Sequence, residues 1–345
     1  MFDCDQQITK FQDEIVQLGE TQRAEMRKRR DSNRDAVRSG LSKAGKPSPV
    51  GFRSQGSYAM RTMIQDTANA YDIDDGVYFD AGDLKGSGGG NMSALDVRKM
   101  VRDALPAEKF STPPQALKNC VRVYYKAGYH VDIPVYRRNA KDDPWSGKKI
   151  FDFQLASAEW KQSDPKAVTD WFKAESVSKC VSGGGANGQL VRVVRLSKLF
   201  ANSRESWKGK VGSGFILSTL IARDCYVGVN GREDVAFRRT LESVRSTLKY
   251  SKVVPHPVLA NETITHGTSD PKAVQLYEKL TEKLELLAPL DDPDCSFGDA
   301  MSAWDKFFGT DWFSGQSDPG GSTKESSAPG NPVKRGSDGR YAKYE

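Results

Sequence analysis

Three closely spaced aspartates lie in a stretch that otherwise has the composition of a buried strand. In DIDDGVYF, residues 72–79, Asp72 and Asp74 flank an isoleucine and Asp75 follows directly. Side chains on a β-strand alternate between its two faces, so Asp72 and Asp74 share one face and Asp75 points to the other. Two carboxylates held side by side raise each other's pKa, and a divalent cation relieves their repulsion. The pattern predicts a metal site on the face of Asp72 and Asp74, with Asp75 in a structural role.

A second predicted strand offers a third carboxylate. YHVDIPVYR, residues 129–137, is rich in β-branched and aromatic residues and holds Asp132 in an apolar frame. Three aspartates from two strands suit two metal ions roughly 3.5 to 4 Å apart, which activate a hydroxyl and neutralise a leaving phosphate. The expected ion is Mg2+, with Mn2+ as the alternative, because Mg2+ binds carboxylates together with substrate phosphates. His130 falls on the same face, and we expect it to be a structural histidine.

Upstream of the acidic strand, QGSYAMRT (residues 55–62) has the features of a phosphate-binding turn. Gly56 lets the backbone approach a triphosphate, and Ser57 at the start of a short predicted helix offers hydrogen-bond donors to its oxygens. Each signal has an ordinary alternative, since Gly-Ser usually only caps a helix and Asp-x-Asp is more often a solvated strand or turn. Their joint order, followed by a lone aspartate in a later strand, favours the metal and nucleotide interpretation.

The composition is that of a globular protein. The chain has 345 residues, of which 37% are hydrophobic and 10% aromatic, enough for a sizeable core. Its formal charge of +6 is compatible with phosphate-bearing partners without requiring them. The five cysteines are scattered and form no CxxC pair, which indicates free thiols in a reducing compartment. With no apolar run long enough for a membrane span and no signal-peptide pattern at the start, we expect a cytoplasmic protein.

The elements that must position these residues fall into two blocks. The first is rich in strands, with one interrupting helix at 93–105. The predicted strands cover residues 73–79, 119–125, 129–137 and 149–156. The second block is helical, with helices predicted near 164–178, 187–203, 213–226, 233–250, 270–287 and 298–309.

This order predicts an α+β fold. A mixed sheet domain occupies residues 1–160, and a helical domain at 161–313 completes the nucleotide-binding cleft. An apolar stripe predicts one long helix over 5–44 that bridges both. Residues 314–345 are dominated by Gly, Ser, Pro and charged residues, which predicts a disordered tail.

The second half of the predicted first helix is basic. Between Arg23 and Arg38 lie seven basic and three acidic residues, and Arg30, Arg34 and Arg38 recur at every fourth position on one face. A solvated helix face is one interpretation, and a surface for a polyanion such as RNA is the other.

The motifs QGSYAMRT, YDIDDGVYF and VDIPVY resemble those of polymerase-β-type nucleotidyltransferases. More narrowly, the chain resembles the bacterial cGAS/DncV-like nucleotidyltransferases (CD-NTases), the cyclic oligonucleotide synthases of CBASS anti-phage defence. The resemblance implies a polymerase-β-like sheet domain followed by a helical domain. It also implies that Asp72, Asp74 and Asp132 bind two metal ions, and that Gln55, Gly56 and Ser57 hold the donor triphosphate.

The resemblance extends into the helical block. VRVVRLSKLFANSR resembles the helix of the family that carries an Arg-x-x-Lys motif, and GSGFILSTLIA resembles the serine-led helix that follows it. By this likeness Lys198 reaches the donor phosphates and Ser213 contacts the nucleotide. From the residues alone, Arg195 and Lys198 lie at i and i+3 on one polar face, and a surface lysine remains the alternative for Lys198.

The resemblance implies an enzyme that condenses nucleoside triphosphates into a cyclic di- or trinucleotide and releases pyrophosphate. ATP and GTP are the expected substrates, with pyrimidine nucleotides as alternatives, and Asp132 is the expected general base. Expected partners are a downstream effector that binds the cyclic product and a ubiquitin-transfer-like conjugation protein acting on the C-terminal tail. No Cys or His cluster builds a zinc-binding DNA sensor, so we expect no double-stranded DNA activator.

Two alternatives stay open at the level of sequence. One is a nucleotidyltransferase that modifies an RNA end, a small molecule or a protein through the same metal site. The other is a non-catalytic nucleotide- or RNA-binding sensor. The presence of all three aspartates, Asp72, Asp74 and Asp132, argues against the second.

Overall fold

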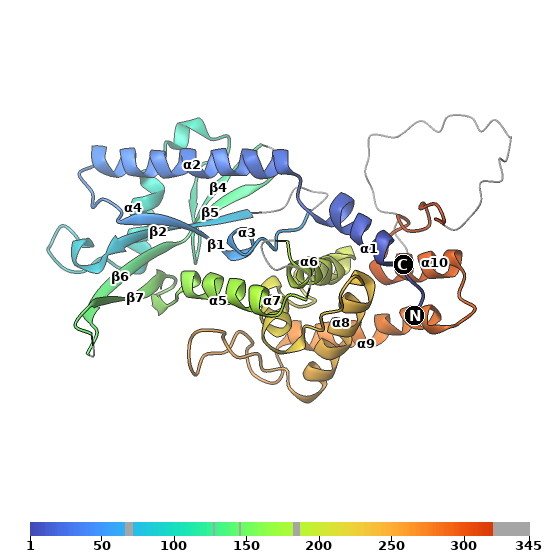
Figure 1. Cartoon of the computed structure of the whole chain (residues 1–345). Coiled ribbons are helices and arrows are strands. Elements are labelled where there is room, and N and C mark those ends of the chain that lie inside the picture. Colours follow the sequence, from blue (N-terminus) through green and yellow to red (C-terminus); the bar gives the residue numbers. More distant parts are fainter. Residues whose placement is uncertain (66–71, 127, 145, 182–186, 320–345) are drawn as a thin grey trace.

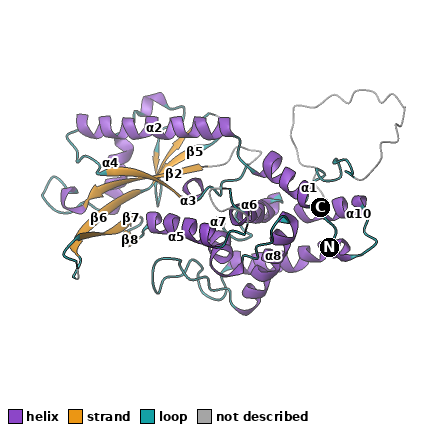
Figure 2. Cartoon of the chain, in the orientation of Figure 1, coloured by secondary structure: helices purple, strands orange, loops and turns teal. Residues whose placement is uncertain are grey.

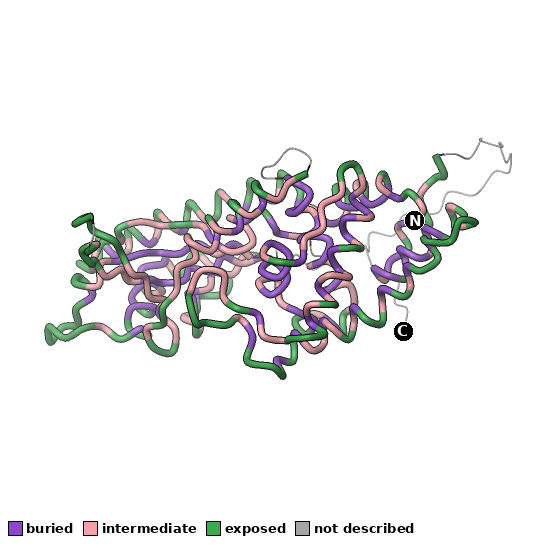
Figure 3. The backbone as a smooth tube through the Cα atoms, turned by 60° about the horizontal axis from the view of Figure 1, so that its bottom comes forward, coloured by how far each residue is buried: buried purple, intermediate pink, exposed green. Residues whose placement is uncertain are grey.

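The chain folds into a sheet half and a helical half. The computed structural model describes residues 1–65, 72–126, 128–144, 146–181 and 187–319. Strands gather at one end of the molecule and helices fill the other, as expected for the predicted α+β fold (Figures 1 and 2). Each half has its own buried interior, with exposed segments at the periphery (Figure 3).

A central strand organises the sheet. The strands are β1 (Gly51–Gln55), β2 (Asp72–Asp80), β3 (Gln115–Ala116), β4 (Val121–Tyr124), β5 (His130–Ile133), β6 (Val135–Asp142), β7 (Lys149–Ala156) and β8 (Trp160–Gln162). On one side β2 pairs antiparallel with β1. On its other side it pairs parallel with β5 near its start and with β6 near its end. The predicted metal ligands therefore lie on two neighbouring strands, Asp72 and Asp74 on β2 and Asp132 on β5.

The strand predicted over 129–137 is wrong as a single element, because it breaks at Pro134. Proline has no backbone N–H to donate to a ladder, and its carbonyl accepts a 2.9 Å hydrogen bond from the amide of Val77. The sheet forks here, so that β4 and β3 continue from β5 while β7 and β8 continue from β6. Asp132 lies on the β5 branch, next to the start of β2.

Helices cover the sheet. Along one face lie α2 (Glu20–Lys43) and α4 (Ala94–Asp103), whose Val37, Leu41, Val97 and Val101 join the strands in one apolar core. On the other side of the sheet lies α5 (Pro165–Ser178), beside the one-turn helix α3 (Gly56–Ala59) (Figure 1). This second face, which α5 contacts, carries the metal-site residues.

The helical half confirms the six predicted helices. After α5 come α6 (Gln189–Asn202), α7 (Gly214–Leu220), α8 (Glu233–Tyr250), α9 (Pro271–Leu284) and α10 (Phe297–Phe308). A π-helical turn, Ile221–Cys225, extends α7, and a 3-10 segment, Glu285–Asp291, extends α9. Aromatic side chains such as Phe237, Trp304 and Phe308 stack at the centre of this core.

The single long helix predicted over 5–44 is wrong. The chain forms α1 (Asp5–Phe11), a π-helical turn (Gln12–Val16) and then a break before α2. Gly19 precedes α2 in an extended conformation, and its amide donates to the Gln22 side chain at 3.0 Å, so a new helix begins there. The apolar side chains of α1 pack into the helical core and those of α2 pack on the sheet. The segment therefore does bridge the two halves, as two helices.

The ends of the predicted domains shift slightly. Strand β8 runs to Gln162, two residues past the expected boundary at 160. Phe313 is buried, and the Ser314 amide donates to Asp305 at 2.9 Å, so the packed chain continues beyond 313. The remainder of the predicted tail, residues 320–345, lies outside the described residues, and so does its predicted conjugation site. Among the described helices, we find none with the length and apolar character that a bilayer span requires.

Candidate active site

Strand register brings the predicted metal ligands together. In the parallel β2–β5 pair, Asp72 lies beside His130 and Asp74 beside Asp132. Registered residues of parallel neighbours point to the same face, which here is the face opposite α2. One ligand atom from each of Asp72, His130 and Asp132 lies within 4.8 Å of the other two. The structure thus brings Asp72 and Asp132 together and adds a histidine that was expected to be structural.

Asp74 is the most strongly perturbed acid of the site. Burial, followed by the negative charges of Asp72 and Asp132, raises the pKa of Asp74 to about 8. Its carboxylate is not part of the 4.8 Å set, since one of its oxygens faces Gly56. A methyl group on Gly56 would lie 2.3 Å from that oxygen, and Gly56 has a φ of +61°. Glycine is required here by both the backbone conformation and the close approach.

Asp132 is held by an arginine that sequence reasoning missed. Arg122 on β4 donates to both carboxylate oxygens of Asp132, from Nε and from Nη2, each at 2.7 Å. This hydrogen bonding raises the pKa of Arg122 and fixes the orientation of the Asp132 carboxylate. Asp132 as a whole residue is only 6% exposed. The antiparallel β4–β5 register places the two residues opposite each other. The sequence indicated both strands but not their register, so the pair could not be predicted.

Asp72 is the exposed member of the site. Its side chain is 41% accessible, and its Oδ2 lies 3.7 Å from the Nε2 of His130. Burial works to raise the pKa of Asp72, but His130, Arg122 and Lys198 outweigh it and lower the pKa below its usual value.

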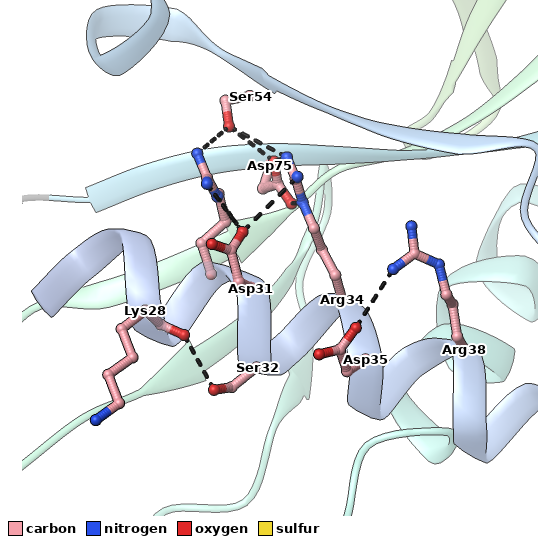
Figure 4. A network of polar contacts seen from close by, with 9 residues as sticks. Lys28, Asp31, Ser32, Arg34, Asp35, Arg38, Ser54 and Asp75 are labelled. Carbon is pink, nitrogen blue, oxygen red and sulfur yellow. Dashed lines mark hydrogen bonds and ion pairs between the residues drawn. The ribbon is translucent and has the colours of Figure 1, made fainter. Parts of the chain in front are cut away.

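Asp75 has the structural role predicted for it. On the opposite face of β2 it accepts hydrogen bonds from Arg34 on α2, at 2.6 Å from Nη2 and 2.7 Å from Nε, and a third from Ser54 at 3.0 Å (Figure 4). Arg30 also donates to Ser54, at 3.1 Å. Arg34 and Arg30 of the basic face are therefore tied to the sheet, whereas Arg38 lies over the ring of Phe52.

The helical half reaches the site through α6. Lys198 donates from Nζ to the carbonyl of Thr62 at 2.6 Å, and Arg195 donates from Nε to the carbonyl of Arg61 at 2.8 Å. Both carbonyls belong to the turn after α3, where Arg61 has a φ of +59°. Burial lowers the pKa of Lys198 to about 8, although the charges of Asp72 and Asp74 oppose the shift. Lys198 is therefore partly buried and lies near the acidic site, which favours the phosphate-binding interpretation over that of a surface lysine.

The other predicted nucleotide contacts lie around this amine and the turn. Ser213 caps α7, accepting from the amide of Ile216 at 3.1 Å, and the next residue, Gly214, packs on the Lys198 side chain. Ser57 lies in α3, which is one turn long and therefore shorter than predicted. Gln55 is buried opposite Asp74 on β1 and donates to the hydroxyl of Tyr136 at 2.9 Å.

The donor chemistry fits a divalent cation. Three carboxylates lie close together on the paired strands β2 and β5, and Asp74, whose pKa is raised by burial and by the charges of Asp72 and Asp132, keeps its proton to unusually high pH. A cation that replaces this proton would relieve the repulsion among Asp72, Asp74 and Asp132. Carboxylates of this kind are the ligands that Mg2+ and Mn2+ prefer.

Comparison with known proteins identifies the sheet half. Residues 50–136 match the family described as "Cyclic GMP-AMP synthase DncV-like, nucleotidyltransferase domain". The chain is 29% identical over 243 residues to cyclic GMP-AMP synthase of Escherichia albertii, which covers 68% of this chain and 49% of that protein. The chain therefore spans about half the length of that curated relative.

Solved structures share the fold of both halves. Vibrio cholerae DncV cyclic AMP-GMP synthase, in complex with a linear intermediate, matches with a TM-score of 0.65 and 17% identity over 85% of this chain and 91% of that one. Escherichia coli CdnC with ATP matches with a TM-score of 0.65 and 17% identity over 89% and 98% of the two chains. Residues 50–136 thus carry a DncV-like nucleotidyltransferase domain, and the chain as a whole shares the fold of DncV and CdnC.

Proposed function

We propose that this chain is a metal-dependent nucleotidyltransferase that condenses nucleoside triphosphates into a cyclic oligonucleotide and releases pyrophosphate. The observation that carries the proposal is the convergence of Asp72 and Asp132, beside Asp74 with its raised pKa, within the DncV-like domain. Support for ATP and GTP as substrates comes from the relatives, which include a cyclic GMP-AMP synthase and a DncV complex with a linear intermediate.

In the proposed reaction Asp72, Asp74 and Asp132 hold two divalent ions, and Mg2+ is the ion we expect. When bound, such ions lower the pKa of an acceptor hydroxyl and neutralise charge on a departing pyrophosphate. Asp132 accepts the proton of the acceptor hydroxyl, and Arg122 keeps this carboxylate oriented through its two hydrogen bonds.

The donor triphosphate lies between the two halves of the chain in this proposal. Gly56 allows the backbone to approach it, and Ser57 offers hydrogen-bond donors. Lys198 has three donors and gives one to Thr62, so two remain for phosphate oxygens. Ser213 directly precedes Gly214, which packs against the Lys198 side chain, so in this proposal Ser213 contacts the nucleotide from the helical half.

The test is product formation by the purified chain. We would incubate it with Mg2+ or Mn2+ and the four ribonucleoside triphosphates, treat with phosphatase and analyse what survives by mass spectrometry. We expect a phosphatase-resistant cyclic product that falls at least about a hundredfold in Asp72→Asn and Asp74→Asn, since each removes a metal ligand. Asp80→Asn is the matched control, because Asp80 ends the same strand and pairs with Arg138 away from the site. Undiminished synthesis in both site variants would refute the proposal.

Transfer to an RNA end is the second candidate, and the basic face of α2 is the feature that supports it. Because Arg34 and Arg30 are tied to Asp75 and Ser54, this face has fewer free cations than its sequence indicates. Salt-sensitive RNA binding, together with labelled nucleotide on the RNA, would favour this candidate.

We infer that the product serves as a signal in anti-phage defence and is bound by a separate effector. The inference rests on the resemblance to CD-NTases, and phage plating on cells that express the chain or its Asp72→Asn variant tests it. Protection by both forms alike would exclude a signalling role for the product. Conjugation of the C-terminal tail stays a prediction, because residues 320–345 lie outside the described chain.

A further inference from the structure

His130 is placed as a ligand rather than as a support. It is the first residue of β5, beside Asp72 on the parallel strand and two residues before Asp132, so all three side chains share one face. Its Nε2 lies 3.7 Å from Asp72 Oδ2, too long for a hydrogen bond. The ring of Tyr124 also lies nearby, with its centroid 6.4 Å from that of the His130 ring.

The distances in this triad are close to those around a single ion. Two ligands of one ion, with bonds of about 2.1 Å, lie at most about 4.2 Å apart. The ligand atoms of Asp72, His130 and Asp132 lie within 4.8 Å of one another, so small side-chain rotations close the difference. The His130 side chain is 18% exposed, enough for an ion to reach it from solvent.

The bond between Arg122 and Asp132 explains why a third ligand matters. Arg122 donates to both oxygens of Asp132 and offsets the negative charge that this carboxylate presents to an ion. A carboxylate has about four acceptor positions, so Asp132 can still bind a metal, but as a weaker ligand than a free aspartate. An imidazole nitrogen beside Asp72 adds a ligand without adding a further negative charge among the acids.

We propose that His130 coordinates one of the metal ions through Nε2, together with Asp72 and Asp132. This inference rests on the metal site of the proposed function and adds which ion that site prefers. Imidazole binds Mn2+, Co2+ and Zn2+ well, whereas Mg2+ strongly prefers oxygen ligands. The site therefore selects Mn2+ over Mg2+ more strongly than three carboxylates alone would.

Pulsed electron paramagnetic resonance of the full-length protein loaded with Mn2+ tests the proposal without any catalysis. A directly bound imidazole nitrogen modulates the electron spin echo, and the chain has three histidines from which that signal can come. We expect the nitrogen modulation in the wild type and in His266→Asn, the matched control, since His266 is exposed in a distant loop. We expect it to disappear in His130→Asn while Mn2+ remains bound.

Metal titrations give a second readout. His130→Asn should weaken Mn2+ binding by about tenfold or more and change Mg2+ binding much less, because the variant loses only a nitrogen ligand. Bound Mn2+ with no nitrogen modulation in the wild type would overturn the proposal, and so would modulation that persists in His130→Asn. Either result leaves the proposed function standing, since that depends on product formation and on the aspartates.

Discussion

At the scale of single residues, Asp74 sets the behaviour of the metal-free site. It shares one face of β2 with Asp72 and lies beside Asp132, and burial between these charges raises its pKa to about 8. Near neutral pH the folded, metal-free protein therefore carries a proton on Asp74. Metal binding must displace this proton, so ion affinity should rise with pH.

The raised pKa of Asp74 predicts how stability depends on pH. The unfolded chain releases this proton near the ordinary value of 3.8, whereas the folded chain retains it up to about 8. Between these values the folded state binds more protons, so the free energy of unfolding contributed by Asp74 falls as pH rises and is fully lost above about 8. In EDTA, Asp74→Asn should therefore match the wild type near pH 4 and exceed it in melting temperature near pH 8.

Thermal melts in EDTA and in Mn2+ check this prediction. In EDTA the advantage of Asp74→Asn should grow steadily with pH, while in Mn2+ it should vanish or reverse, because the variant lacks a ligand. If Asp74→Asn were less stable than the wild type in EDTA near pH 8, the raised pKa of Asp74 would be contradicted.

At the scale of elements, the long helix α2 is fixed to the sheet by a buried ion pair. Arg34 is 22% exposed and Asp75 3%, and their carboxylate–guanidinium contact is bidentate (Figure 4). Since Asp75 directly follows Asp74, the same contact anchors the strand that carries the metal ligands to α2.

Arg34→Met should lower the free energy of unfolding by about 3 kcal/mol, because it leaves the Asp75 carboxylate buried and unpaired. Arg38→Met, one turn further along α2, should cost less, about 0.5 to 1 kcal/mol, since Arg38 is exposed, its ion pair is with exposed Asp35, and it also lies over the ring of Phe52. Urea unfolding of both variants makes the comparison. Adding Asp75→Asn to Arg34→Met should recover part of the loss, and a full additive loss instead would exclude an unpaired charge as the cause.

Much of the site was predictable from the sequence, and the predictions that failed did so for physical reasons. Alternation along β2 separated Asp72 and Asp74 from Asp75, because it depends only on strand geometry. The contact between Arg122 and Asp132 depends on the register of two strands, which no local pattern encodes. The break before α2 and the fork at Pro134 were missed for a related reason: the apolar pattern continued through both, and only the local backbone chemistry of Gly19 and Pro134 interrupts it.

At the scale of the whole molecule, α6 joins the two halves at the turn beside the site. Arg195 is 2% exposed and has no carboxylate partner among the described residues, binding instead to the Arg61 carbonyl and to the side chains of Gln17 and Asn187. Burial lowers its pKa to about 10. One guanidinium thus holds together the segment between α1 and α2, the turn after α3 and the start of the helical half.

Arg195→Met should therefore loosen the turn at residues 60–65. Arg204 offers a matched control, since it also donates to backbone carbonyls and has its pKa lowered by burial to about 10, but its partners lie within the helical half. Hydrogen exchange should rise at residues 60–65 in Arg195→Met and remain unchanged there in Arg204→Met. Triphosphate affinity should fall only in Arg195→Met, and equal effects in the two variants would show that α6 does not link the halves.

The close approach of Gly56 to Asp74 has a consequence for the genetics of the site. Gly45 has the same φ of +61° but no atom within 4 Å of an added methyl group, so Gly45→Ala carries the backbone strain alone. Gly56→Ala adds a collision with the Asp74 carboxylate, 2.3 Å away. In a library that varies both positions and is selected for folded protein, we expect residues other than glycine at position 56 only where position 74 holds a smaller residue that lacks the carboxylate. Positions 56 and 74 therefore form an epistatic pair, in which the tolerance of one is set by the identity of the other.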